Sequence, residues 1–252
     1  MDNTVRIAEM VSLPSKGMVY EGEISDKVEL KSMTTRHEML RLSASESTNK
    51  IMADILDDCI VDDLGISAYD LCLGDFQFLL YKLRIVTFGP DYELNSICPV
   101  CGSPIKLDMN LDDSEVNLFD ESLVDKLTLY LPTNGEKVEL ALSTPRVMDR
   151  IDKQVKEYRN KHKGSIENPY LLYLMLNSIV TVDDESIINP IAYEEWVKDL
   201  PLRDLNVLRQ RIDDINSMIG VKLTINTNCT VCGEEVEVPF RVSEQFFRPS
   251  VE

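Results

Sequence analysis

The pattern of apolar residues predicts several helices. Between residues 47 and 63 apolar side chains return every three or four positions and aspartates fill the outer positions, which predicts an amphipathic helix with an acidic face. Residues 76–88 are apolar on nearly every face, so we expect this helix to be buried centrally or against another subunit. Helical spacing also appears over 145–163, 170–180 and 202–219.

Capping signals place the ends of these helices. Thr35 and Glu38 have the spacing of a capping box, which predicts a short helix through Leu42. Three pairs in which Thr or Asn precedes proline predict the starts of three further helices. Gly220 predicts the C-terminal cap of the helix over 202–219. The three pairs are Thr144-Pro145, Asn168-Pro169 and Asn189-Pro190, the last of which precedes the only tryptophan, Trp196.

Alternating apolar and polar residues predict the strands. The Asn134-Gly135 pair tolerates positive φ and predicts a β-hairpin between residues 127–131 and 138–142. Further alternation predicts strands over 105–111, 221–225 and 236–240. The stretches 105–111 and 236–240 each follow a pair of cysteines, whereas 221–225 precedes one.

The cysteine pairs carry the clearest chemistry. Cys98 and Cys101 enclose two residues and are followed by glycine, and Cys229 and Cys232 repeat this arrangement after 127 intervening residues. A Cys-x-x-Cys turn presents two thiolates to one ion, and two such turns complete a tetrahedral shell of four sulfurs. We therefore predict one structural zinc site with Cys98, Cys101, Cys229 and Cys232 as ligands.

Two other interpretations of these cysteines remain open. One alternative is that each pair is a redox dithiol, but neither pair lies at the junction of a strand and a helix, where that chemistry is usual. Disulfides are disfavoured because no signal-peptide pattern precedes the cysteines. The remaining two, Cys59 and Cys72, lie in apolar periodic segments, where a free thiol acts as a small hydrophobic residue.

A shared metal site would dictate the topology. It would bring residues 98–111 and 223–240 together, so that the hairpin and helices between them form an insertion. The predicted fold class is α+β and helix-rich, with a discontinuous four-cysteine zinc-ribbon β-unit. We divide the chain into a mainly helical region over 1–95, the β-unit over 96–142 and 221–252, and a helical insertion over 143–220.

Charge narrows the choice of partners. The chain has 252 residues and a formal net charge of −18, which repels nucleic-acid phosphates unless a local basic patch exists. Residues 146–163 are the only basic concentration, with seven Lys or Arg against three acids. This helix could form a charged solvent face or contact an acidic partner. It also supports an alternative function, a zinc-ribbon protein that binds nucleic acid or regulates transcription.

Neither catalysis nor membrane insertion is expected. The chain contains only two histidines, His37 and His162, and lacks phosphate-binding, HExxH and GxSxG motifs. The longest apolar stretch, residues 170–182, contains Asn177 and is too short to span a bilayer. We therefore expect a soluble, non-enzymatic protein that folds inside a cell. Near the end, Phe246 and Phe247 either tuck back onto the chain or dock into a neighbour.

Several stretches resemble the T4-type phage baseplate hub family. They are residues 13–20 (LPSKGMVY), 28–38 (VELKSMTTRHE), 69–101 and 246–249 (FFRP). The resemblance implies a small acidic phage tail protein that is needed to build the baseplate hub and is sometimes compared with tail assembly chaperones. It implies partners among hub or tape-measure proteins, and a location in the virion tail baseplate or in the host cytoplasm during assembly. It supplies no catalytic residue.

Overall fold

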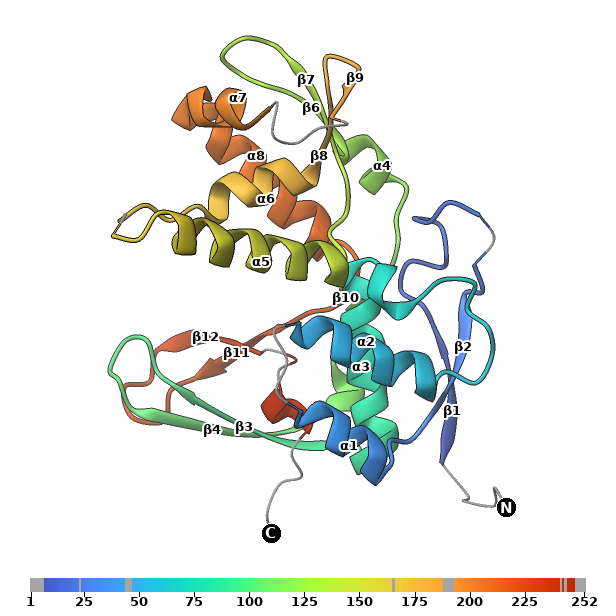
Figure 1. Cartoon of the computed structure of the whole chain (residues 1–252). Coiled ribbons are helices and arrows are strands. Elements are labelled where there is room, and N and C mark those ends of the chain that lie inside the picture. Colours follow the sequence, from blue (N-terminus) through green and yellow to red (C-terminus); the bar gives the residue numbers. More distant parts are fainter. Residues whose placement is uncertain are drawn as a thin grey trace.

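A computed structural model describes residues 7–22, 24–43, 47–164, 166–187, 193–240, 242 and 244–247. Helices are combined with small antiparallel sheets, in agreement with the predicted α+β class. Figure 1 shows a lower body built on α3, an upper body built on helices α5 to α8, and an arm of two β-hairpins that projects from the lower body. No described helix combines the length and apolar character needed to cross a bilayer.

The lower body is organised around α3. This helix is buried on almost all faces, as predicted, and packs against α2 and the two-stranded β1–β2 sheet. Its elements are β1 (Ala8–Ser12), β2 (Lys27–Lys31), α1 (Thr35–Arg41), α2 (Thr48–Cys59), η1 (Ala68–Asp70) and α3 (Leu73–Phe88). Because α3 has no polar face, it supplies the centre of an apolar core rather than an outer layer.

The upper body contains a sheet and helices that share one core. The antiparallel sheet has the order β6-β7-β8-β9, and its first hairpin is the one predicted from Asn134-Gly135. Val138 of β7 and Ile212 of α8 lie in the same apolar cluster. The elements are α4 (Ser122–Lys126), β6 (Thr128–Tyr130), β7 (Lys137–Leu140), α5 (Pro145–Lys161), α6 (Tyr170–Ser178), β8 (Ile179–Val182), β9 (Glu185–Ser186), α7 (Glu194–Asp199) and α8 (Leu202–Ser217). The division of the chain at residues 142 and 143 stays a prediction.

The arm consists of two hairpins from distant parts of the chain. Its strands are β3 (Asp91–Ile97) with β4 (Pro104–Asn110), and β11 (Thr224–Asn228) with β12 (Glu235–Pro239). Ile105, Val236 and Val238 form a small core between the hairpins, together with Cys98 and Cys229. A core of this size buries little apolar surface.

A close backbone approach joins the lower body to the segment that returns from the upper body. The strand β10 (Gly220–Val221) pairs with β5 (Val116–Asn117) and crosses the start of α3 at Gly74. A Cβ atom at Gly220 would lie 2.7 Å from Gly74 Cα, and a Cβ at Gly74 would collide with the Ile219 carbonyl. Gly220 is therefore needed for this crossing and has φ of +104°; it does not cap α8, which ends at Ser217.

Several predicted helix ends are shifted. The capping residue of α1 is Thr34, whose backbone N–H donates to His37 Nδ1 at 2.9 Å, so the predicted capping box at Thr35 is wrong by one residue. Helix α2 ends at Cys59, and α6 ends at Ser178 because the next residues join the sheet as β8. Thr144 caps α5 as predicted. The pair Asn189-Pro190 lies outside the described residues.

The chain end folds back onto the lower body. Phe246 and Phe247, in η4 (Glu244–Phe247), are 0% and 1% exposed. Phe246 packs against Tyr81, Tyr92 and Phe240. Phe246 and Phe247 therefore tuck back onto the chain, which is the first of the two predicted alternatives. Arg248 and Pro249 lie outside the described residues. The remaining short element is η2 (Leu111–Asp113).

Candidate metal centre

The two cysteine pairs occupy the turns at the end of the arm. In the first turn Gly102 N donates to Cys98 O at 2.9 Å, and in the second Gly233 N donates to Cys229 O at 2.8 Å. Both glycines have positive φ, +73° and +76°, which side chains other than glycine rarely adopt. The Cys-x-x-Cys-Gly spacing thus encodes the same turn twice, and each turn directs two sulfurs toward the other hairpin.

The structure brings all four predicted ligands together. Cys98 Sγ lies 3.8 Å from Cys232 Sγ, and Cys101 Sγ lies 3.7 Å from Cys229 Sγ. All four sulfurs lie within 4.8 Å of one another. These separations exceed the S–S bond length of about 2.05 Å in a disulfide. They match the edge of about 3.8 Å in a tetrahedron with metal–sulfur distances of about 2.3 Å.

Charge around the sulfurs also suits a cation. The Ser103 hydroxyl, 3.3 Å from Cys101 Sγ, and the Ser103 backbone lower the pKa of Cys101 to about 6. Hydrogen bonds from the backbone of Cys232 and Val231 lower the pKa of Cys229. The Glu234 backbone acts in the same direction on Cys232, but burial and the neighbouring sulfurs outweigh it and raise that pKa to about 12. Four adjacent thiolates repel one another, and a bound cation would relieve this repulsion.

The arrangement is closed. Cys98 and Cys229 are buried in the arm core, whereas Cys101 and Cys232 are exposed at its surface. A metal ion held by all four sulfurs has no open position for water or substrate, so the site can crosslink the hairpins but cannot activate water. That these residues bind an ion stays a prediction.

The other two cysteines lie away from this cluster, inside the protein. Burial and the nearby Asp75 carboxylate raise the pKa of Cys72 to about 12, so its thiol stays protonated. Cys59 is 0% exposed in the core of the lower body.

Asp75 organises the segment around residues 13–20. It accepts hydrogen bonds from Ser15 N at 2.9 Å and Tyr20 Oη at 2.6 Å, and from the Ser15 hydroxyl. Burial and the adjacent Cys72 and Asp75 raise the pKa of Tyr20, so its phenol stays a donor. No sequence pattern predicts this buried network, which holds the LPSKG segment at the start of α3.

The aspartates of α2 are used within the lower body. Asp58 Oδ2 lies 2.5 Å from His37 Nε2, so His37 is a buried packing residue. Asp57 accepts from Ser67 Oγ at 2.8 Å and Ala68 N at 2.7 Å, and Asp54 pairs with Lys50. These contacts stabilise the helix and the following turn.

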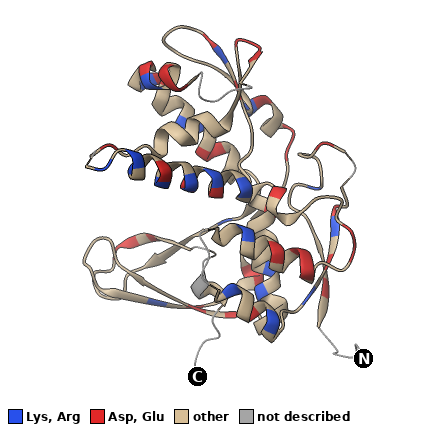
Figure 2. Cartoon of the chain, in the orientation of Figure 1, with Lys and Arg blue, Asp and Glu red and all other residues tan. Residues whose placement is uncertain are grey.

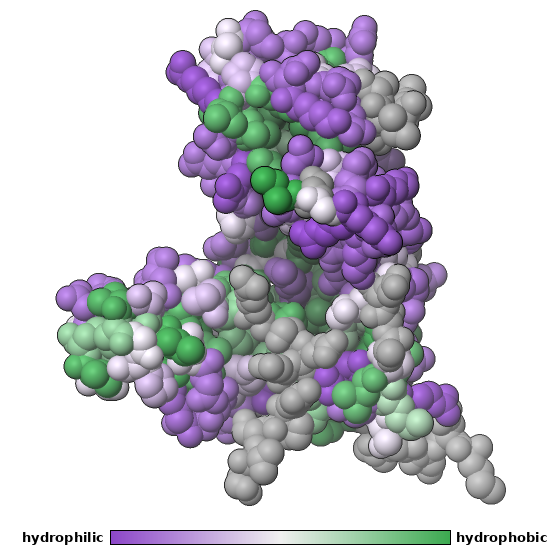
Figure 3. Space-filling model, turned by 60° about the vertical axis from the view of Figure 1, so that its left-hand side comes forward, coloured by the Kyte–Doolittle hydropathy of each residue, from purple (hydrophilic) through white to green (hydrophobic). Residues whose placement is uncertain are grey.

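An apolar arm tip surrounds the sulfur cluster. Ile97, Val100 and Val231 are 70%, 62% and 68% exposed, and we call these three residues the arm tip. Figure 3 shows hydrophobic residues gathered at the end of the projecting arm. Val100 and Val231 hold the same position in the two turns, between the paired cysteines. The sequence does not indicate them, because isolated apolar residues inside turns give no periodic signal.

Helix α5 carries exposed bases. Arg146 is paired with Asp70, their atoms Nε and Oδ1 being 2.5 Å apart. Five further bases of α5 form no ion pair with any described carboxylate, and we call four of them the α5 bases: Arg150, Lys153, Lys156 and Arg159. Figure 2 shows basic positions, with acidic ones between them, along α5, which lies above the arm.

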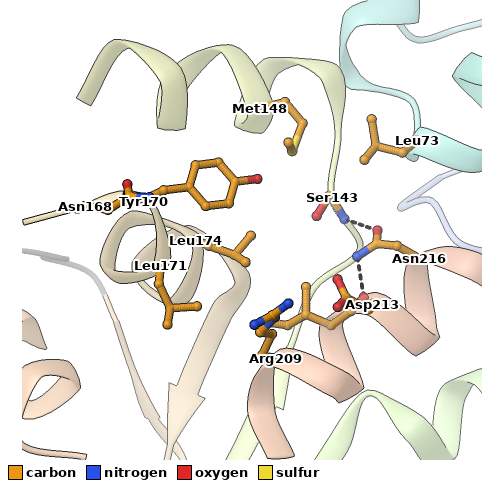
Figure 4. A pocket seen from close by; sticks show the side chains of 11 residues that line it. Leu73, Ser143, Met148, Asn168, Tyr170, Leu171, Leu174, Arg209, Asp213 and Asn216 are labelled. Carbon is orange, nitrogen blue, oxygen red and sulfur yellow. Dashed lines mark hydrogen bonds between the residues drawn. The ribbon is translucent and has the colours of Figure 1, made fainter. Parts of the chain in front are cut away.

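A cavity lies between α5, α6 and α8. Its volume is about 590 Å³. Figure 4 shows Met148 of α5 and Leu174 of α6 at its wall, with the Tyr170 ring extending across it toward Ser143. Arg209 and Asp213 of α8 add charged groups at one side. The cavity is mainly apolar. Met148, which lines it, belongs to the same helix as the α5 bases.

Comparison with known proteins gives one match. A family model described as "T4 bacteriophage base plate protein" matches residues 6–248, which is nearly the whole chain. No curated protein and no solved structure matches the chain.

Proposed function

The chain belongs to the family of T4 bacteriophage base plate proteins, and from this premise we propose that it is a non-enzymatic component of the baseplate hub. It acts structurally or in the assembly of the hub and tail, through contacts with other tail proteins. The family match over residues 6–248 carries this proposal. The arm, whose exposed apolar tip stands away from both bodies, supports a role in protein contacts.

The proposed partners are baseplate hub or tape-measure proteins. The protein would meet them in the host cytoplasm during assembly, and it either stays in the virion tail baseplate or leaves as a chaperone does. Co-expression pulldowns with each hub and tape-measure protein test the contacts, with the arm-tip variant Val100→Asp/Val231→Asp as a comparison. Failure of the wild-type chain to retain any of these proteins would contradict the proposed role.

Mass spectrometry of purified virions separates the two modes of action. A structural component is expected in constant stoichiometry with other baseplate proteins, whereas an assembly factor is expected in infected cells and not in virions. Absence from tail assemblies and from their intermediates would oppose both.

We further propose that the four cysteines hold one structural zinc ion. The sulfur separations of 3.7 and 3.8 Å support this, because zinc prefers tetrahedral thiolate ligands. The ion would crosslink the two hairpins into a discontinuous zinc ribbon. We keep as a proposal the division of the chain into regions 1–95, 96–142 with 221–252, and 143–220. Elemental analysis of protein purified without added metal should find one zinc per chain. A zinc-free chain with the same melting temperature would oppose the assignment.

One observation favours a second candidate function. The α5 bases are exposed and unpaired among the described residues, as a nucleic-acid contact requires. The net charge of −18 acts against such binding. A gel-shift experiment decides: salt-sensitive binding of DNA or RNA that is lost in Arg150→Glu/Lys153→Glu/Lys156→Glu would support a nucleic-acid-binding protein.

A further inference from the structure

The arm combines an apolar end with acidic sides. Residues 91–110 and 224–239 contain six acids and one base, Lys106, which pairs with Glu93. The remaining exposed acids on its strands and second turn form no ion pair among the described residues, and we call four of them the arm acids: Asp108, Glu234, Glu235 and Glu237. A surface with an apolar centre and unpaired charges around it is suited to a partner with an apolar receptor and bases beside it.

This chain carries such a receptor in its upper body. The α5 bases are the basic concentration of an otherwise acidic protein, and the cavity lined by Met148, Tyr170 and Leu174 lies against the same helix. Arg159 follows Met148 by eleven residues, about three helical turns, and therefore lies on the same side of α5. Lys156 lies about 80° around the helix axis from Met148, whereas Arg150 and Lys153 lie about 140° or more away, so an arm whose tip entered this cavity would run beside Lys156 and Arg159.

Within one molecule the two surfaces remain apart. No ion pair joins an arm acid to an α5 base in the described part of the chain. Figure 1 shows α5 and the arm on the same side of the molecule, one above the other, and Figure 3 shows a hollow between the arm and the upper body. When two complementary surfaces lie on one side of a molecule, a dimer with two-fold symmetry can form both contacts at once. Residue i of each copy then meets residue j of the other.

We propose that two copies of this chain form a symmetric dimer in which each arm tip enters the cavity beside α5 of the other copy. The arm acids of each copy then face Lys156 and Arg159 of α5 in the other copy. The apolar tip supplies most of the affinity, since exposed ion pairs contribute little, and the charges set orientation. This inference goes beyond the proposed function; it requires the arm to keep its shape, so zinc content is measured on the same samples.

Sedimentation equilibrium of the full-length chain tests the dimer. The wild-type protein should shift with concentration from 28.7 kDa toward twice that mass. Val100→Asp/Val231→Asp should weaken the dimer roughly tenfold or more, because two charges would enter an apolar cavity. The matched control is Met39→Asp/Leu42→Asp, which alters exposed apolar residues of α1 and its C-cap and should leave the dimer unchanged. Equal zinc in all samples shows that the arm is intact.

A charge exchange gives the sharper readout. The arm variant Glu234→Lys/Glu235→Lys/Glu237→Lys and the helix variant Lys156→Glu/Arg159→Glu should each form a weaker dimer alone than the wild type, since like charges then face each other. Mixed in equal amounts, they should form a heterodimer, because both contacts are again between opposite charges. Reversing Lys27, Arg36 and Arg203 to Glu is the control for net charge.

Three outcomes would overturn the proposal. They are a wild-type chain that stays at 28.7 kDa at all concentrations, a dimer that survives the tip variant, and a mixture of the charge variants that fails to associate. A monomer whose tip instead binds a different tail protein would also overturn it and would assign the tip to that partner.

Discussion

Cys98 and Cys232 lie with their sulfurs 3.8 Å apart although 134 positions separate them in the chain. The contact closes a long loop that contains the entire upper body, and closing such a loop costs conformational entropy. The five buried residues of the arm core offer little apolar area to offset this cost. A metal ion between the hairpins would supply the missing free energy, because binding to a site that exists only in the folded state stabilises that state.

Replacing a sulfur in the cluster should therefore unfold the arm. Cys98→Ser or Cys232→Ser is expected to lower the unfolding free energy by about 3 kcal/mol or more and to reduce solubility, because a four-sulfur site loses one of its ligands. Differential scanning calorimetry together with zinc analysis measures both effects. Thr230→Ser, in an exposed position of the second turn, is the control. An unchanged melting temperature and zinc content in either cysteine variant would contradict the proposed site.

Gly74→Ala should destabilise the junction of α3 and β10. The added methyl group would collide with the backbone carbonyl of Ile219, which cannot move without displacing β10. We expect a loss of about 3 kcal/mol, compared with about 1 kcal/mol for Gly164→Ala, where only the positive φ is unfavourable. Urea denaturation followed by tryptophan fluorescence measures the difference. Equal losses in the two variants would show that the crossing is looser than described.

Phe246→Ala should detach the chain end from the lower body. The ring is 0% exposed, and its neighbours include Tyr81, Tyr92 and the buried Arg84 guanidinium, which lies 5.9 Å from the ring centroid. Removal should cost about 3–5 kcal/mol, as for other fully buried phenylalanines. Phe88→Ala, at a ring that is 39% exposed, should cost distinctly less. Thermal unfolding of the two variants side by side checks the order, and a reversed order would contradict it.

The pair of Asp70 and Arg146 should contribute stability at neutral pH and lose this contribution in acid. Hydrogen bonding to Arg146 lowers the pKa of Asp70 below its usual value. A carboxyl group with a lower pKa in the folded state stabilises it above the unfolded pKa of about 3.9, and this contribution is lost as the pH falls through the folded pKa.

Asp70→Asn should therefore lower the unfolding free energy at pH 7 by less than about 1 kcal/mol, since the pair is partly exposed. The difference from wild type should shrink as the pH approaches 3. Denaturation at a series of pH values measures it, with Asp214→Asn as the control at an exposed aspartate. A difference in unfolding free energy that grows as the pH falls would contradict the lowered pKa of Asp70 in the folded state.

Local patterns were sufficient for much of the fold. Helical spacing located α2, α3, α5 and α8, and the Asn134-Gly135 pair located the β6–β7 hairpin. Ends were less accurate, because Thr34 and Thr35 both fit an N-cap and only packing selects one. The end of α6 was missed for a related reason: residues 179–182 are apolar in either conformation, and pairing with β7 makes them a strand.

The sequence by itself determined the chemical type of the site and the family. Two Cys-x-x-Cys-Gly turns fix where four thiols can be presented, since the spacing and the positive φ of glycine are local properties, and the resemblance to baseplate proteins is confirmed by the match over residues 6–248. Only the tertiary structure decided that the sulfurs lie within 4.8 Å of one another and that Val100 and Val231 stay exposed beside them. The approach of the sulfurs and the exposure of the two valines depend on contacts between residues more than a hundred positions apart. A sequence pattern that repeats every two or four residues carries no information about such contacts.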